Sequence, residues 1–169
     1  DKAEKVIKKQ QKLSPDDPRF RVDMGYLFIM QGDISKGRKI YETCLKDLKP
    51  DKIQIYNLTY AFSNRRETDF MIRTYLRGRE LLNDLAAFSF ELAYTYESLG
   101  STELMIDEYL NLLTTTPQQM SMVQNRLQAW LSDDVDNSKN DTYRSILLKK
   151  TQQNPDEILY NELLLWHSV

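Results

Sequence analysis

Residues 25–41 read GYLFIMQGDISKGRKIY, and the pattern of this stretch returns along the chain every 34 residues. Small residues, aromatic residues and tyrosines all follow this interval. The small residues are Gly25, Thr59 and Ala93; the aromatic residues are Phe28, Phe62 and Tyr96; the tyrosines are Tyr41, Tyr75, Tyr109 and Tyr143. A shared period of this length is typical of a repeat array, in which each unit buries its apolar face against the next.

The composition fits a folded protein rather than a disordered or membrane-spanning one. Of the 169 residues, 41% are hydrophobic and 28% are charged, and the net charge is −2. A chain of this length and composition can bury a core. The small net charge provides no overall basic field for nucleic acid, and no apolar run approaches the roughly 18 residues of a membrane span. We therefore expect neither a nucleic-acid partner nor membrane insertion by this segment.

Prolines spaced by about one or two periods divide the chain into short helices, because proline lacks an amide N–H and clashes with the preceding helical turn. These prolines are Pro15, Pro50, Pro117 and Pro155. Pro18 is expected in a first helical turn, where no N–H is needed. The expected helices span residues 1–13, 18–31, 34–47, 51–64, 68–82, 86–98, 102–114, 118–131, 142–153 and 156–167.

Taken in pairs, these helices are expected to form one all-α repeat domain over residues 1–169. The domain would comprise the second helix of a truncated repeat (1–16), three full repeats (17–50, 51–84 and 85–118), a divergent repeat (119–155) and the first helix of a further repeat (156–169). Because the first and last units are half-repeats, we expect a segment of a longer array. The unpaired apolar run 163–166 also suggests self-association.

Helix–turn–helix units of this length resemble the tetratricopeptide repeat over most of the chain. The resemblance is carried by the small and aromatic first-helix positions, the second-helix tyrosines, and the turns Gly32-Asp33 and Gly100-Ser101. It implies an all-α fold, specifically a right-handed α-solenoid of helical hairpins. The sequence departs from the family pattern at Arg66, where a turn glycine is usual. It also departs at Met71 and Met105, where a small residue usually stands near the start of the second helix.

No catalytic constellation or cofactor site is recognisable in the sequence. The only histidine, His167, and the only cysteine, Cys44, are 123 residues apart, which in a solenoid separates them by several repeats. Cys44 falls on the apolar face of its helix and is expected to be buried, whereas His167 is expected to be exposed on a fraying last helix. No phosphate loop, HExxH or nucleophile elbow is present. We therefore predict a protein that is not an enzyme and that uses no cofactor.

The acidic stretch 132–141 invites comparison with a calcium-binding loop. An EF-hand loop begun at Asp134 would place Lys139 where glycine is required and Ser145 where a bidentate glutamate is required. Both the geometry and the charge therefore argue against a metal site. The stretch is expected instead to form a solvated turn, with Asn140 or Asp141 capping the helix that follows.

A second set of residues follows the same period, one position after the small residues. Tyr26, Tyr60 and Tyr94 are 34 residues apart, and each follows an apolar residue by one helical turn. In the tetratricopeptide resemblance these first-helix positions face the concave groove. The expected partner-binding groove comprises Val22, Tyr26, Tyr56, Tyr60, Phe90, Tyr94, Gln124 and Gln128. The alternative is that these tyrosines pack against neighbouring first helices.

The expected function is that of a non-catalytic scaffold that binds a protein or peptide segment in this groove, since tyrosine gives a large contact area at low entropic cost. The alternative is a structural spacer within a larger repeat protein, or a chain that self-associates, and either would protect the tyrosine rings. Some tetratricopeptide domains bind the carboxylate tails of heat-shock chaperones through five polar positions. These correspond to Val22, Tyr26, Asn57, Ala87 and Glu91, and only Asn57 agrees. The resemblance therefore argues against that use.

Overall fold

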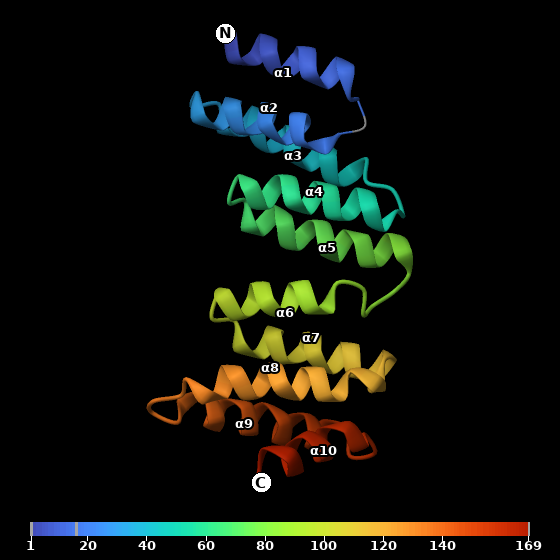
Figure 1. Cartoon of the computed structure of the whole chain (residues 1–169), viewed down its shortest axis with the longest axis vertical. Helices are drawn as coiled ribbons and strands as arrows, with labels where there is room; N and C mark the ends of the chain where they lie inside the picture. Colours follow the sequence, from blue (N-terminus) through green and yellow to red (C-terminus); the bar gives the residue numbers. More distant parts are fainter. Residues whose placement is uncertain (1, 16, 169) are drawn as a thin grey trace. The chain divides into compact units, whose positions relative to one another are not determined.

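The computed structural model describes residues 2–15 and 17–168, and over these residues it is helical, with no β-strand. The helices are α1 (Lys2–Leu13), α2 (Pro18–Met30), α3 (Ile34–Lys46), α4 (Lys52–Asn64), α5 (Thr68–Leu82), α6 (Ser89–Ser98), α7 (Thr102–Thr115), the 3-10 helix η1 (Pro117–Gln119), α8 (Met120–Ser132), α9 (Ser138–Gln153) and α10 (Ile158–His167) (Figure 1). The fold is an all-α helical repeat, as the sequence predicts. The chain divides into two compact units, residues 1–87 and residues 88–169.

The helix bounds agree with the sequence prediction to within two residues, except at two helix starts. Helix α6 begins at Ser89 because the residues before it form a turn, in which the Asp84 carboxylate accepts the amide N–H groups of Ala86 and Ala87. Helix α9 begins four residues earlier than predicted, at Ser138, directly after Asn137 with its positive φ of 64°.

In the first unit, α1 packs on α2, and the hairpins α2–α3 and α4–α5 pack side by side (Figure 1). Three aromatic rings join the two hairpins. The Tyr41 ring on α3 meets Phe62 on α4 edge-on at 5.1 Å between centroids, and meets Phe70 on α5 at 5.0 Å. Phe62 and Phe70 stack on each other at 5.3 Å. All three side chains are buried, so the aromatic positions of the 34-residue pattern form the core between successive hairpins.

Glycine allows α2 and α3 to approach each other closely. A Cβ atom on Gly25 would lie 2.5 Å from the Tyr41 ring, and one on Gly37 would lie 2.5 Å from both the Gly25 carbonyl oxygen and Ile29 Cγ1. These distances are far below ordinary van der Waals contact. In this hairpin, Gly25 and Gly37 are therefore required by the close approach of α2 and α3.

The turns between paired helices also repeat. Gly32, Arg66 and Gly100 have positive φ angles of 90°, 58° and 69°. In each turn the next residue donates its amide N–H to a carbonyl five residues earlier. These bonds run from Asp33 to Phe28, from Glu67 to Phe62 and from Ser101 to Tyr96. Arg66 thus adopts the left-handed conformation that glycine adopts at the equivalent positions, so the period survives the substitution.

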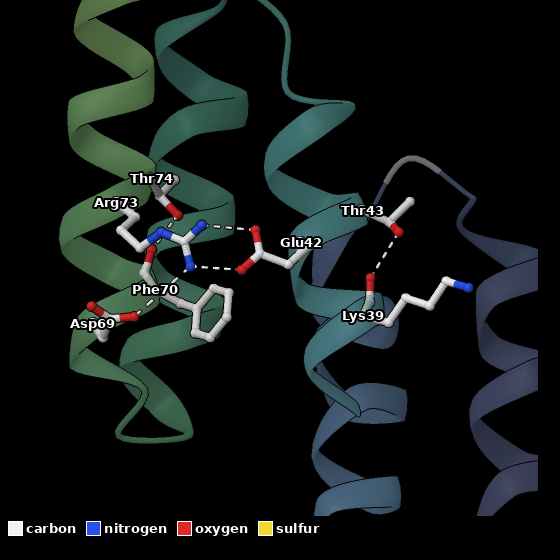
Figure 2. A network of polar contacts seen from close by, with 7 residues as sticks. All are labelled: Lys39, Glu42, Thr43, Asp69, Phe70, Arg73 and Thr74. Atoms are coloured by element: carbon white, nitrogen blue, oxygen red, sulfur yellow. Dashed lines mark hydrogen bonds and ion pairs between the residues drawn. The ribbon is translucent and has the colours of Figure 1, made fainter. Parts of the chain in front are cut away.

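A polar link outside the aromatic core also joins the two hairpins. Arg73 on α5 donates two hydrogen bonds of 2.7 Å to the carboxylate of Glu42 on α3, and its guanidinium lies over the Phe70 ring at 4.8 Å (Figure 2). Asp69 lies 3.9 Å from the same guanidinium. A planar guanidinium held by both oxygens of one carboxylate fixes direction as well as distance between α3 and α5.

In the second unit, α6 and α7 form a hairpin, η1 leads into α8, and α9 packs against both α7 and α10. Tyr143 and Leu147 on α9 and Leu163 on α10 are almost completely buried. Lys150 on α9 forms an ion pair with Asp107 on α7. The divergent fourth repeat therefore still builds a core, in which Tyr143 keeps its place in the 34-residue pattern.

Candidate functional site

Of the predicted groove residues, Val22 is the clearest exception, because its side chain is completely buried (0% exposed). Helix α2 has α1, α3 and α4 packed against it, so little of its circumference faces solvent. Val22 belongs to the core of the first unit and offers no surface to a partner. The prediction was incorrect for this residue, since it placed Val22 one turn below Tyr26 without taking the helices packed around α2 into account.

Tyr26, on the same helix, is half-buried beneath a cation. The Arg65 guanidinium lies 4.8 Å from the centre of the Tyr26 ring and also forms an ion pair of 2.6 Å with Asp23. Arg65 directly follows α4, so this contact ties the end of α4 to α2. One face of the Tyr26 ring is therefore occupied by a cation–π contact.

The two tyrosines of α4 are more accessible. Tyr60 is 61% exposed, and Tyr56, one turn earlier, is also exposed while its ring edge contacts Tyr75 of α5 at 6.3 Å between centroids. Together with Tyr26 they form what we call the tyrosine surface of the first unit. Aromatic rings exposed to this degree retain most of their contact area for a partner.

Two hollows of about 330 and 410 Å³ flank Tyr60. The first lies between α4 and α5 and is lined by Tyr56, Asn57, Thr59, Tyr60, Ser63, Met71 and Tyr75. The second lies at the start of α2 and is lined by Asp17, Pro18, Arg19, Asn57 and Tyr60. Tyr60 and Asn57 thus line both hollows and form the wall between them. The first hollow is mainly apolar with a few polar groups, which is the usual form of a binding site, whereas polar side chains predominate in the lining of the second.

The remaining predicted groove residues belong to the second unit, where they differ among themselves. Tyr94 on α6 is 62% exposed, whereas Phe90, one turn earlier, is half-buried with its ring against Tyr109 of α7 at 6.2 Å. On α8, Gln124 is half-buried and Gln128 is exposed. Within this unit, Tyr94 therefore presents an accessible aromatic ring, while Phe90 mainly contributes to helix packing.

The structure confirms the prediction for Cys44 and contradicts it for His167. Cys44 is buried, and burial raises the pKa of its thiol, although the nearby Arg21 acts in the opposite direction. A neutral buried thiol is a poor nucleophile. His167 is half-buried rather than exposed: its ring lies 5.1 Å from that of Tyr143, and its Nε2 is 2.8 Å from Asn140 Oδ1. The last turn of α10 is thus held in place by α9.

The acidic turn before α9 has a structural role that differs from the predicted cap. Asn140 and Asp141 lie within α9, and Asn137, at the N-cap position, makes no side-chain capping bond. Asp134 instead accepts the backbone N–H of Asn140 at 2.8 Å and its side-chain amide at 2.6 Å. Burial acts to raise the pKa of Asp134, but these hydrogen bonds and those involving Lys139 outweigh it, and the pKa is lowered.

Across residues 2–15 and 17–168, no three His, Cys, Asp or Glu side chains gather in a way that could hold a metal ion. None of the helices in that part of the chain combines the length and the apolar character needed to cross a membrane. No protein-family model matches the chain, and no curated protein matches its sequence.

The sequence identified the exposed tyrosines but missed the features around them. No sequence pattern indicated the contacts of Arg65, because its partners Asp23 and Tyr26 are about forty residues away and belong to another helix. The hollows beside Tyr60 were also missed, since they depend on the side chains of α5 and on the start of α2. Asn57 was noted only for its place in a chaperone-type clamp, yet it lies between both hollows.

Proposed function

We propose that this protein is a non-catalytic interaction scaffold, a tetratricopeptide-like right-handed solenoid that binds an extended protein segment on the tyrosine surface. The observation that carries the proposal is the position of Tyr60, exposed between two hollows that share Asn57 in their lining. An aromatic ring flanked by hollows can be enclosed by two side chains of an extended segment that are two positions apart, since these point to the same face. Tyrosines in such positions commonly dominate binding energy.

Polar groups around Tyr60 suit a main chain rather than a purely apolar ligand. The Asn57 side chain can donate to a carbonyl and accept from an amide N–H of the same segment. The phenol of Tyr60 adds a further group that can donate or accept a hydrogen bond. Arg19 lines the second hollow but is already bound to Asp17 through several hydrogen bonds, so a charge on the partner is not required there.

The proposal is tested with a peptide selected from a random display library against the wild-type chain. Tyr60→Ala should weaken binding of the peptide by about 2 kcal/mol, which is a roughly 30-fold loss of affinity, as expected when a central aromatic side chain is truncated. The fold should be unaffected because the ring is mostly exposed. Titration calorimetry and circular dichroism measure the two effects.

Leu99→Ala is the matched control, since Leu99 is also an exposed large side chain but follows α6 in the second unit. It should leave the affinity unchanged. Selected peptides that bind Tyr60→Ala, Tyr94→Ala and the wild type equally well would show that the tyrosines are not the binding surface.

The second candidate is that the chain is a structural spacer within a repeat protein, or that it self-associates. It is favoured by α10, on which Ile158 and Leu165 are both exposed. Analytical ultracentrifugation over a range of concentrations tests self-association directly. In the spacer case, covalent labelling would find Tyr60 and Tyr94 protected in the assembled protein.

A further inference from the structure

Helix α1 presents a stripe of apolar and basic side chains on the face that does not contact α2. Val6 and Leu13 are 54% and 68% exposed, and they lie seven residues, or two helical turns, apart. Lys9 lies between them on the same stripe. The helix carries five lysines and one glutamate, and that glutamate, Glu4, is paired with Lys8 at 2.7 Å.

Helix α10 presents a stripe of the same design with the opposite charge. Ile158 and Leu165 are 68% and 70% exposed and are again seven residues apart. Glu162 is exposed and lies between them. Leu163, on the opposite face, is buried against the rest of the second unit, so the exposed stripe is not the face that holds the helix in place.

The two stripes are in register when the helices run antiparallel. Lys9 is three residues after Val6, and Glu162 is three residues before Leu165. Leu13 is then four residues beyond Lys9, and Ile158 is four residues before Glu162. The facing pairs are Val6 with Leu165, Lys9 with Glu162, and Leu13 with Ile158. Antiparallel pairing is also the usual arrangement of two packed helices joined by a short turn, such as α2 and α3.

The charges of the two units favour the same contact. Residues 1–87 contain 18 lysines and arginines and 13 acidic residues, a net charge of +5. Residues 88–169 contain 5 basic and 12 acidic residues, a net charge of −7. Opposite net charges on the interacting units steer association and disfavour contacts between like units.

We propose that two copies of this chain associate head to tail, with α10 of one copy packed antiparallel on α1 of the other. The inference rests on the self-association candidate and supplies the surface that it requires; it is separate from the tyrosine surface. Because the contact joins different surfaces of the two copies, each pair retains one unused α1 and one unused α10. Such heterologous contacts continue into longer assemblies unless their rotation closes a ring.

Two variants test the proposal, each with one stripe disabled. The α1 variant carries Val6→Glu and Lys9→Glu; the α10 variant carries Glu162→Lys and Leu165→Lys. All four side chains are exposed, so circular dichroism should show wild-type helicity. In sedimentation velocity, the wild type should form species that grow with concentration and shrink with salt, because the contact includes an ion pair.

Each variant alone should remain monomeric, but an equimolar mixture should form a dimer and stop there. In that mixture the intact α10 of the first variant meets the intact α1 of the second. The chain that combines Lys9→Glu with Glu162→Lys should regain assembly that either single change loses. Restored assembly would show that these two residues face each other.

The remaining outcomes are equally decisive. A wild-type chain that stays monomeric at every concentration would overturn both self-association and this contact. If the α1 variant assembled as fully as the wild type, self-association would stand but the pairing with α1 would be wrong. Disulfide cross-linking between chains carrying Val6→Cys and chains carrying Leu165→Cys checks the register, with Val6→Cys and Ile158→Cys as the mismatched control. Tyr60→Ala should assemble normally, which separates this result from the peptide-binding proposal.

Discussion

The hairpins α2–α3 and α4–α5 follow the same 34-residue frame but close in different ways. In α2–α3 two glycines, Gly25 and Gly37, bring the backbones into contact. In α4–α5 the equivalent positions are Thr59 and Met71, so the two helices of that hairpin have side chains between them. The turns differ too, since one is made by a glycine and the other by an arginine in the same conformation.

This difference shows that the period constrains geometry more strongly than it constrains residue type. Larger residues stand in the second hairpin where glycines stand in the first, and the conformation of the turn is kept. The hollow bordered by Thr59, Met71 and Tyr75 lies in the hairpin that lacks the glycines. The hairpin without the glycines is therefore also the one that carries the candidate binding site.

The largest effect is expected at the aromatic contact between the hairpins. Tyr41→Ala should lower the free energy of unfolding by about 3–5 kcal/mol, because a fully buried ring packed on two others leaves a cavity. Tyr75→Ala, at the same position of the next hairpin, should lower the free energy of unfolding by clearly less, because Tyr75 already borders a hollow. Urea unfolding measures both changes, and equal losses would contradict the contrast between the hairpins.

Gly37→Ala should destabilise the chain by about 1–3 kcal/mol, because the added Cβ would meet the Gly25 carbonyl and the helices cannot separate without losing contacts. Alanine is the better helix former by nearly 1 kcal/mol, so the effect of crowding opposes that of propensity. Met71→Ala is the control in the other hairpin and introduces no clash. A thermal melt in which Gly37→Ala is stabilising would rule out close packing of α2 on α3.

The ion pair between α3 and α5 should contribute about 1 kcal/mol, since Arg73 and Glu42 are both substantially exposed and screened by solvent. The Arg73 hydrogen bonds lower the pKa of Glu42 below its ordinary value. The stabilisation is therefore fully present above the unfolded-state pKa of about 4.3 and is lost as the pH falls through the lowered folded-state pKa.

Glu42→Gln should accordingly be less stable than the wild type at pH 7, and the two should converge in acid. Urea unfolding at several pH values follows the difference. A gap between the two proteins that stayed constant from pH 7 to pH 3 would show that Glu42 does not stabilise the hairpins through its charge.

The smallest effect is expected at the Arg66 turn. Arg66→Gly should stabilise the chain by about 0.5 kcal/mol, because glycine adopts a positive φ without steric cost but loses more entropy on folding. Gly32→Ala should destabilise by about 1 kcal/mol through φ alone, since no atom lies near the added Cβ. The two substitutions should therefore shift the melting temperature in opposite directions, which differential scanning calorimetry can measure.

Much of the fold could be predicted because its signals are local. Proline positions, turn glycines and the 34-residue spacing predicted, to within two residues at both ends, eight of the ten α-helices found in the described part of the chain. The two larger errors involve a positive φ at Phe88, which no residue preference indicated, and at Asn137, where the preference of asparagine for this conformation was overlooked. The binding surface was predicted less completely, because exposure depends on which distant helix covers a residue.

The sequence by itself determined that the chain is an all-α repeat, since a helical hairpin is specified by residues close together in the chain. It also determined which aromatic positions share a period. Only the tertiary structure decided that Val22 is buried, that Arg65 covers Tyr26, and that Tyr60 stands between two hollows. The physical reason is that these properties arise where separate helices meet, and contact between helices depends on side chains that no local pattern relates to each other.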